Sequence, residues 1–180
     1  MELAGPTGTA ALSSSAVTSP AEAVHDLYGR HYGRLVRLAT MLLGDVGRAE
    51  EIVQDAFVDL MARWERIRDP AAAVSYLRTS VANGARSDLR HLRVVRRYPA
   101  EKPDDVDSAE VGALSNVEHE RIMIAVSLLP PRQGQVLILR YYGQLSEAEI
   151  AESLGISRGA VKSHSSRGLQ ALRTVLEVNP

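Results

Sequence analysis

Cysteine is absent from the 180-residue chain, and aromatic residues are scarce, with one Trp, six Tyr and one Phe. Without cysteine there are no disulfides, no thiol catalysis, no Cys-ligated zinc and no cysteine-based redox sensing. No apolar run approaches the ~20 residues that span a bilayer, and the N-terminus has no basic start followed by an apolar block. We therefore expect a soluble, cytoplasmic protein without membrane insertion.

Net charge is also small, −1 at pH 7, and by itself argues against a nucleic-acid binder. The charges are unevenly distributed, however. Residues 20–99 carry 13 Lys and Arg against 10 Asp and Glu, residues 100–120 carry one against seven, and residues 121–180 carry seven against four. Two mildly basic blocks therefore flank an acidic connector, and this asymmetry says more about partners than the total does.

The composition favours helix over strand, because Ala, Leu, Val, Glu and Arg dominate a chain that is 45% apolar. Apolar residues at three- and four-residue steps predict one helix from Pro20, one over about 46–64 and one over about 71–93. Tyr28 is expected on the inward face of the first. The segment QVLILRYY (135–142) could pass for a buried strand, but its flanks are helical and no second strand is available to pair with it.

The predicted fold is all-α, with two small helical domains joined by an acidic linker. The expected parts are a disordered tail over 1–19, a first helical domain over 20–97, a flexible linker over 98–115 and a helix-turn-helix domain over 116–176. Charge repulsion among the acids of the linker would keep such a spacer extended. These acids are Asp104, Asp105, Asp107 and Glu110.

The segment LSEAEIAESLGISRGAVKSHSSRGLQALR (145–173) predicts two short helices joined by a tight turn. Ser146 and Glu149 fit a capping box, Gly155 suits the left-handed position that ends a helix, and Ser157 caps the next helix. The N-terminal end of such a helix enters the major groove, where Arg, Lys and Ser contact bases and phosphates. The candidate DNA-binding residues are Ser157, Arg158, Gly159, Lys162, Ser163, Ser166 and Arg167. The predicted inward residues are Val161, Ser165, Gly168, Leu169 and Leu172.

A helix-turn-helix alone is compatible with a simple repressor, a response regulator or a promoter-reading polymerase subunit. The motif AVKSH (160–164) also resembles the end of response regulators of the quorum-sensing type. Those proteins carry a sensory α/β domain upstream, whereas the upstream block here is helical throughout. The choice therefore depends on residues outside the motif.

Two longer segments carry a family resemblance. LLPPRQGQVLILRYYGQLSEAEIAESLGISRGAVKSHSSRGLQALR (128–173) resembles the C-terminal domain of extracytoplasmic-function sigma factors of RNA polymerase, close to the actinobacterial group often called the SigE family. LATMLLGDVGRAEEIVQDAFVDLMARWERIRDPAAAVSYLRTSVANGARSDLR (38–90) resembles that family's N-terminal promoter-melting domain. Two matching blocks in the right order are far more specific than one helix-turn-helix. The resemblance covers about residues 22–176.

The resemblance implies roles by position. The residues implied to dock on the clamp helices of the largest polymerase subunit are Glu50, Glu51, Gln54 and Asp55. Residues 66–70 are implied to form a loop that captures a base flipped from the minus-ten element, and residues 157–167 to read the minus-thirty-five element. The residues implied to contact the minus-ten element are Arg66, Arg68, Asp69, Asn83, Arg86, Arg90, Arg93 and Arg97. The flap of the second-largest subunit, promoter DNA and an anti-sigma factor are further implied partners. For the linker, the resemblance implies that Asp104, Asp105, Asp107 and Glu110 occupy basic surfaces that later hold RNA phosphates, and the alternative is that they only keep a spacer extended.

The chain departs from the family pattern at Ser165, where the family usually has a leucine. A buried hydroxyl without a partner costs on the order of 1–3 kcal/mol. Gly159 and Gly168 each weaken the same helix by roughly 1 kcal/mol relative to alanine if they are interior. We therefore expect this DNA-binding head to depend on DNA or a partner to be well ordered.

The leading hypothesis is a sigma factor, and the alternative is a free-standing helix-turn-helix regulator that binds DNA without polymerase. An enzyme finds little support, because the five histidines are scattered without metal-ligand spacing. The sequence also has no nucleophile motif and no phosphate-binding loop. We expect no catalytic residue, no metal and no cofactor.

Overall fold

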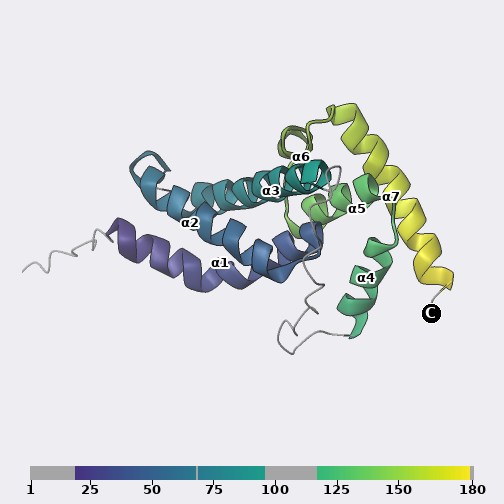
Figure 1. The fold of residues 1–180 in the computed structure, drawn as a ribbon, viewed down its shortest axis with the longest axis horizontal. Coiled ribbons are helices and arrows are strands. Elements are labelled where there is room, and N and C mark those ends of the chain that lie inside the picture. The colour runs from purple at the N-terminus through teal and green to yellow at the C-terminus, as the bar shows by residue number, and fades with distance from the viewer. Residues whose placement is uncertain (1–18, 68, 96–116, 179–180) are drawn as a thin grey trace, which may run out of the picture.

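The computed structural model describes residues 19–67, 69–95 and 117–178, and every regular element in these ranges is a helix (Figure 1). The elements are α1 (Pro20–Leu43), α2 (Val46–Ile67), α3 (Pro70–Val95), α4 (Val117–Ser127), α5 (Pro131–Leu137), the π-helix η1 (Ile138–Tyr142), α6 (Glu147–Leu154) and α7 (Arg158–Val178). The predicted all-α fold is thus confirmed. Residues 1–18 and the predicted acidic linker over 98–115 lie outside the described ranges.

Local sequence sets both ends of α1. Ser19 N donates to Glu22 Oε2 at 2.8 Å, and Glu22 N donates to Ser19 Oγ at 3.2 Å. This reciprocal capping box satisfies two amides that have no partner within the helix. Gly44 ends the helix in the left-handed region, with φ 75°, and its amide donates to Thr40 O at 2.7 Å.

The second and third helices are longer than the pattern predicted. Helix α2 continues to Ile67 and α3 begins at Pro70, so that few residues connect them. Asp69 explains the early start of α3, since its Oδ1 accepts from Ala71 N at 3.0 Å. Pro70 takes the first helical position, where the missing amide is not needed.

Helices α1, α2 and α3 pack together as one unit, with a core of aliphatic side chains. Leu38, Leu60, Leu77, Val53 and Val81 are fully buried at its centre. Every helix of the unit contributes at least one of them, so the apolar stripes of all three face inward. The stripe expected on α2 is therefore confirmed.

The second unit contains α4 to α7 and a π-helix that the sequence did not predict. Within η1, Gly143 N donates to Ile138 O at 2.9 Å, a bond that spans five residues instead of four. Val136 and Leu139 are fully buried on either side of the transition from α5 to η1. The segment QVLILRYY is therefore helical, in agreement with the choice against a strand.

For two residues the prediction of an inward position is wrong. Tyr28 is 39% exposed and lies at the edge of the first unit, where its ring stacks on Tyr32 with 4.5 Å between ring centroids. Leu169 is 44% exposed. Its neighbour Gly168 is the residue that faces α5, and successive helical residues point about 100° apart.

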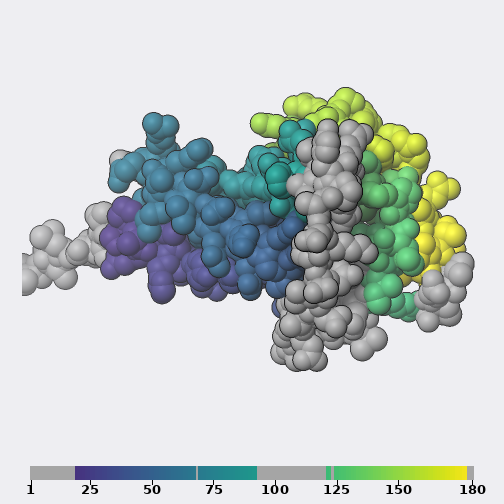
Figure 2. Space-filling view, in the orientation of Figure 1, coloured from purple at the N-terminus to yellow at the C-terminus, as the bar shows by residue number. Residues whose placement is uncertain are grey.

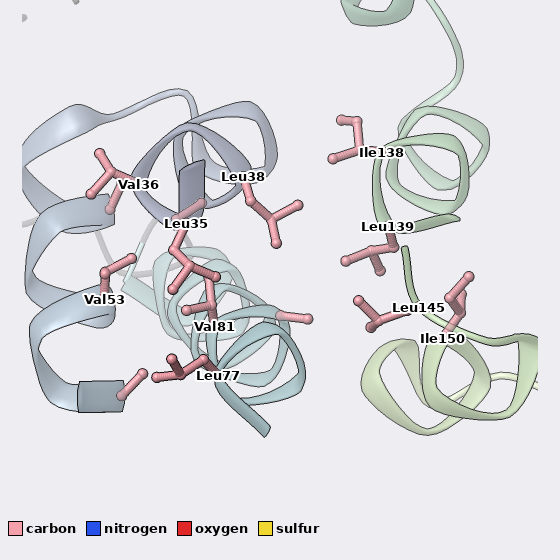
Figure 3. Close-up of a cluster of buried hydrophobic side chains, with 14 of the residues drawn as sticks. Leu35, Val36, Leu38, Val53, Leu77, Val81, Ile138, Leu139, Leu145 and Ile150 are labelled. Carbon is pink, nitrogen blue, oxygen red and sulfur yellow. The ribbon is translucent and has the colours of Figure 1, made fainter. Parts of the chain in front are cut away.

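In Figure 2 the first unit lies to the left and the second to the right. One cluster of buried apolar side chains has members in both units. Contacts run between α3 and α6 and between α1 and η1. Figure 3 shows the two sides of this cluster, with Leu35 and Leu77 among the side chains of the first unit and Leu139, Leu145 and Ile150 among those of the second. The candidate functional residues are therefore positioned by one continuous helical framework.

Candidate DNA and polymerase interfaces

The helix-turn-helix forms where the sequence predicts it. Ser146 N donates to Glu149 Oε2 at 2.7 Å, and Glu149 N donates to Ser146 Oγ at 3.3 Å. Gly155 ends α6 with φ 62°, and Ser157 Oγ accepts from Ala160 N at 3.1 Å at the start of α7. Cap, turn and second cap are thus all confirmed, and they fix the direction in which α7 leaves α6.

The candidate DNA-binding residues of α7 share one property: all are exposed. They are Ser157, Arg158, Gly159, Lys162, Ser163, Ser166 and Arg167. Arg167 Nη2 donates to Ser163 Oγ at 2.9 Å. Lys162 Nζ lies 3.8 Å from Glu147 Oε2, yet the lysine side chain is 70% exposed. This contact is weak in water, so the ammonium stays available to a phosphate.

The two glycines of α7 differ in what surrounds them. At Gly159 an added methyl group would meet only Ser157 Oγ, at 3.8 Å, so the backbone can approach another molecule closely. At Gly168 it would lie 3.2 Å from Leu137 Cδ1 and 3.3 Å from Gln133 Cβ. Gly168 therefore permits close packing of α7 on α5, a role that the sequence did not indicate.

Buried hydroxyls confirm that this unit carries polar groups inside. Ser165 is 6% exposed, as its inward position predicted. Ser153 on α6 is 0% exposed, and its Oγ has no hydrogen-bond partner among the described residues. An unpaired buried hydroxyl costs on the order of 1–3 kcal/mol, so Ser153 is the clearer polar defect of the two.

The acidic face of α2 points to solvent. Its residues Glu50, Glu51, Gln54 and Asp55 are all exposed, while Ala49, Val53 and Ala56 are buried on the opposite side. Among the described residues, no hydrogen bond or ion pair joins Glu51, Gln54 or Asp55 to another side chain. Val58 and Met61 are 68% and 43% exposed and extend this face along the helix. The sequence analysis missed both, although Val58 follows Gln54 by four residues and Met61 follows Val58 by three, which places them on this face.

A groove with a volume of about 470 Å³ separates α2 from α3. Asn83 lines it together with Asp55, Arg63, Tyr76 and Thr79. The Arg63 guanidinium lies over the Tyr76 ring, 5.8 Å from its centroid. The groove thus combines an aromatic face, an amide and a hydroxyl, the groups that stack on a base and bind its edges.

The predicted minus-ten residues do not form one cluster. Arg86 and Arg90 line a second cavity of about 410 Å³, which lies between the two units and includes Arg132 and Gln135 of α5. Asn83 lies in the α2–α3 groove instead. Arg66, in the last turn of α2, and Asp69, just before the first residue of α3, are exposed at the other end of α3. Arg68, Arg97 and the side chain of Arg93 lie outside the described part of the structure.

Arg86 is engaged by the second unit. Its Nη1 donates to Glu152 O at 3.2 Å, at the end of α6. A methyl group on Gly155 would overlap the Arg86 guanidinium, so the glycine turn of the helix-turn-helix is also what lets this arginine fit. The sequence carries no signal for this contact, because its partners are 66 residues apart.

Two further polar contacts cross the same interface. Ser75 Oγ on α3 donates to Glu149 Oε1 on α6 at 3.1 Å. Arg34 on α1 donates to Tyr142 O at 3.4 Å, and its guanidinium lies 5.6 Å from the Tyr142 ring centroid. The π-helix therefore presents both the carbonyl and the ring of Tyr142 to α1.

Titratable groups at the interface are shifted by these surroundings. Hydrogen bonds from Ser146, and then from Ser75 and Thr79, lower the pKa of Glu149 below its ordinary value. Burial, followed by the charges of Arg78, Arg30 and Arg34, lowers the pKa of His31. The interface therefore favours an ionised Glu149 and a neutral His31.

The described residues contain no cluster of His, Asp and Glu that could hold a metal ion. Within those same ranges, no helix is both long and apolar enough to cross a membrane.

Each of the two units matches a known protein family. Residues 27–98 match the family model for sigma-70 region 2, and residues 119–172 match that for sigma-70, region 4. The chain is 34% identical over 143 residues to an RNA polymerase sigma-E factor of Streptomyces avermitilis, covering 79% of each chain. It is 30% identical over 167 residues to the ECF RNA polymerase sigma factor SigL of Mycobacterium tuberculosis, covering 91% of this chain and 94% of the relative. The chain belongs to the RNA polymerase sigma factors, in their extracytoplasmic-function group.

Solved structures show the same fold. The sigma factor RpoE of Bartonella quintana, in complex with the anti-sigma factor NepR, superposes with a TM-score of 0.57 at 22% identity, covering 86% of this chain and 99% of that one. CnrH, in complex with the cytosolic domain of CnrY, gives a TM-score of 0.55 at 21% identity, with coverages of 89% and 96%. At these identities the likeness extends to the arrangement of helices and no further.

Proposed function

We propose that the chain binds core RNA polymerase and directs it to specific promoters by reading a minus-thirty-five and a minus-ten element. The observation that carries this proposal is the presence of two exposed, oppositely charged faces on separate helical units. The acidic face lies on α2, and the basic face is the N-terminal half of α7. A free-standing regulator needs only the second face, and family membership also favours the sigma factor over that alternative.

The proposed division of labour follows the two units, with functional domains over 20–97 and 116–176. Residues 157–167 read the minus-thirty-five element from the major groove, where Arg158 is placed for a bidentate contact to guanine and Lys162 for a phosphate. The chain performs no chemistry in this scheme. It works in the cytoplasm beside the polymerase, which makes the RNA.

The minus-ten element meets α3 and the adjoining loop in the same scheme. Flipping a base out of the stack costs a few kcal/mol, so the surface needs a place for the base and cations for the backbone. The α2–α3 groove, with Asn83 and Tyr76 at its wall, suits the base. Arg86 and Arg90 suit the phosphates, and Arg66 lies at the loop that is proposed to capture the flipped base.

Core polymerase is proposed to dock on α2. The acidic residues Glu51 and Asp55 and the amide of Gln54 carry no competing partner within the described residues, and Val58 and Met61 add apolar area beside them. This combination of charge and apolar surface is typical of a protein interface with a basic partner. The clamp helices of the largest subunit are the proposed partner here, and the flap of the second-largest subunit is proposed for the second unit.

An anti-sigma factor is the remaining proposed partner. The similar structure of RpoE is described in complex with the anti-sigma factor NepR, and that of CnrH in complex with the cytosolic domain of CnrY. These complexes support the proposal by analogy of fold. Co-purification from the native host, with identification of the bound proteins, tests it.

Run-off transcription with core polymerase tests the main proposal. On a promoter selected by the wild-type holoenzyme, Arg158→Ala should lower transcription about 10- to 100-fold, the effect of losing one bidentate base contact. Binding to core polymerase should not change. Gln170→Ala, an exposed position further along α7, is the matched control and should behave as wild type. Failure of the wild-type chain to support transcription on any selected promoter would contradict the proposal.

A further inference from the structure

The first helix of the helix-turn-helix is acidic, although it belongs to a DNA-binding motif. Residues 121–180 carry four Asp and Glu side chains, and three of them, Glu147, Glu149 and Glu152, lie on α6. In a helix-turn-helix the first helix crosses the DNA backbone, and a carboxylate there is repelled by the phosphates. The surroundings of each carboxylate therefore decide how it affects DNA binding.

Two of these acids are accounted for away from α7. The carboxylate of Glu149 accepts from Ser146 N in the capping box and from Ser75 Oγ on α3. Glu152 is exposed and follows Glu147 by five residues, which places it about 140° further around the helix axis. Glu147 remains, and it faces the second helix of the motif.

The two carboxylate oxygens of Glu147 contact two different cations. Arg140 Nη1, on η1, donates to Oε1 at 3.1 Å, and Lys162 Nζ, on α7, lies 3.8 Å from Oε2. The side chains of Arg140 and Glu147 are 36% and 32% exposed, whereas that of Lys162 is 70% exposed. The pair with Arg140 is thus closer and less screened by solvent than the pair with Lys162. One carboxylate connects η1, α6 and α7 on the side where Lys162 is a candidate DNA contact.

This arrangement reduces the attraction between the helix-turn-helix and any DNA. Guanidinium and ammonium groups bind phosphates, and a carboxylate placed between two of them offsets one of the two positive charges. Phosphate contacts contribute to the binding of every sequence alike, whereas base contacts such as the one proposed for Arg158 depend on the sequence. Glu147 therefore opposes the sequence-independent part of DNA binding and leaves the base contacts unchanged.

We propose that Glu147 is a positioning residue that binds Arg140, offsets the charge of Lys162 and thereby limits sequence-independent DNA binding. The affinity for every duplex is lowered by the same factor. Weak, non-specific complexes are then lost at physiological salt, while a complex with additional base contacts persists. The role in promoter choice rests on the proposed function, whereas the electrostatic effect is a property of the chain with any duplex.

Salt titrations of Glu147→Gln test this proposal. The full-length chain is titrated, by fluorescence anisotropy, with a duplex that contains a selected minus-thirty-five sequence and with a scrambled duplex. Glu147→Gln should bind both duplexes roughly three- to tenfold more tightly at low salt. It should also steepen the plot of log affinity against log salt concentration by about 1, because one more positive charge is available to the phosphates.

Glu152→Gln is the matched control, since it removes the same charge from the other side of α6. It should change the slope by less than about half as much. An unchanged slope for Glu147→Gln would overturn the proposal, and so would tighter binding confined to the promoter duplex. Absence of duplex binding by both wild type and Glu147→Gln at low salt would overturn it as well.

A purely structural role of Glu147 predicts the opposite sign. Glu147 is the first residue of α6, where a negative charge stabilises the helix N-terminus. If this were its only role, Glu147→Gln would lower the midpoint of thermal unfolding and weaken DNA binding, and that result would overturn the proposal.

Removal of both cations tests whether Glu147 acts through them. In a chain that carries Arg140→Gln and Lys162→Gln, the further change Glu147→Gln should alter the affinity by less than about twofold. A full gain in this background would mean that the carboxylate repels phosphates directly, and the assignment as a positioning residue would be wrong.

This proposal and the proposed function fail in different ways. If the salt slopes change as expected but the chain supports no transcription with core polymerase, the proposed function is wrong and the role of Glu147 stands. If the chain supports transcription while the slopes of wild type and Glu147→Gln are equal, the role of Glu147 is wrong and the proposed function stands.

Discussion

The interior of the α1–α3 unit and the interface between the two units bury apolar side chains in different ways. In the interior, residues such as Ala39, Leu60 and Leu77 have no exposed surface and come from three helices that follow one another in the chain. At the interface, arginines surround a cavity of about 410 Å³ and single hydrogen bonds join residues far apart in the sequence. The first arrangement suits a permanent scaffold, and the second suits a contact that is made and broken.

The largest expected effect breaks the scaffold. Leu77→Ala should lower the free energy of unfolding by about 2–5 kcal/mol, because it removes three heavy atoms from a closed core and leaves a cavity. Urea denaturation followed by circular dichroism measures this loss. Val58→Ala on α2 is the control, since Val58 is 68% exposed, and it should change stability by no more than about 0.5 kcal/mol. A loss as small as the control's would contradict the packing described for this unit.

A smaller effect compares packed and open positions within α7. Gly159→Ala should raise the stability by about 0.5–1 kcal/mol, because alanine is the better helix former and nothing crowds the new methyl group. Gly168→Ala gains the same propensity but presses on Leu137 and Gln133, and overpacking costs about 1–3 kcal/mol. We expect it to be destabilising overall. Thermal unfolding of the two variants decides this, and stabilisation by both would mean that α5 and α7 are loosely packed.

The smallest effect is a pH dependence of the folding stability. His31 lies near Arg30 and Arg34 on its own helix, Arg78 on α3 and Tyr142 on η1. Its pKa is lowered from 6.5, first by burial and then by the arginine charges. Because the folded chain prefers the neutral imidazole, the contribution of His31 to stability is fully present above pH 6.5 and is lost as the pH falls through the lowered pKa.

The midpoint of urea denaturation should therefore move to lower urea concentration as the pH falls below 6.5. His31→Gln should remove this dependence and serves as the control. Glu149 does not interfere, because its pKa is lowered from 4.5 and its contribution is lost only at still lower pH. A pH response that persists in His31→Gln would assign the effect to another group.

The sequence was sufficient for features that depend on neighbours in the chain. The capping box of Ser146 and Glu149, the left-handed Gly155 and the cap at Ser157 each involve residues within one turn, and all three are present. The exposed acidic face of α2 follows in the same way from helical periodicity. Local chemistry and period determine these features before any tertiary contact forms.

The features that the sequence did not predict depend on packing between distant residues. Arg34 and Tyr142 are 108 residues apart, and Arg86 and Glu152 are 66 apart. No periodicity relates such pairs. The sequence pattern assigns Arg86 and Asn83 to the same minus-ten surface. Only the structure shows that Arg86 contacts the second unit while Asn83 lies in the α2–α3 groove.

The π-helix makes the chain sensitive to insertions and deletions at one point. An α-helix turns about 100° per residue, and η1 contains one residue more per hydrogen-bonded ring than an α-turn does. Removing one residue between Ile138 and Tyr142 would leave a plain helix of almost the same composition, yet it would rotate the remaining side chains away from α1. We therefore expect this segment to accept many substitutions and almost no change of length. Natural variation in length should fall instead on the connection between α3 and α4.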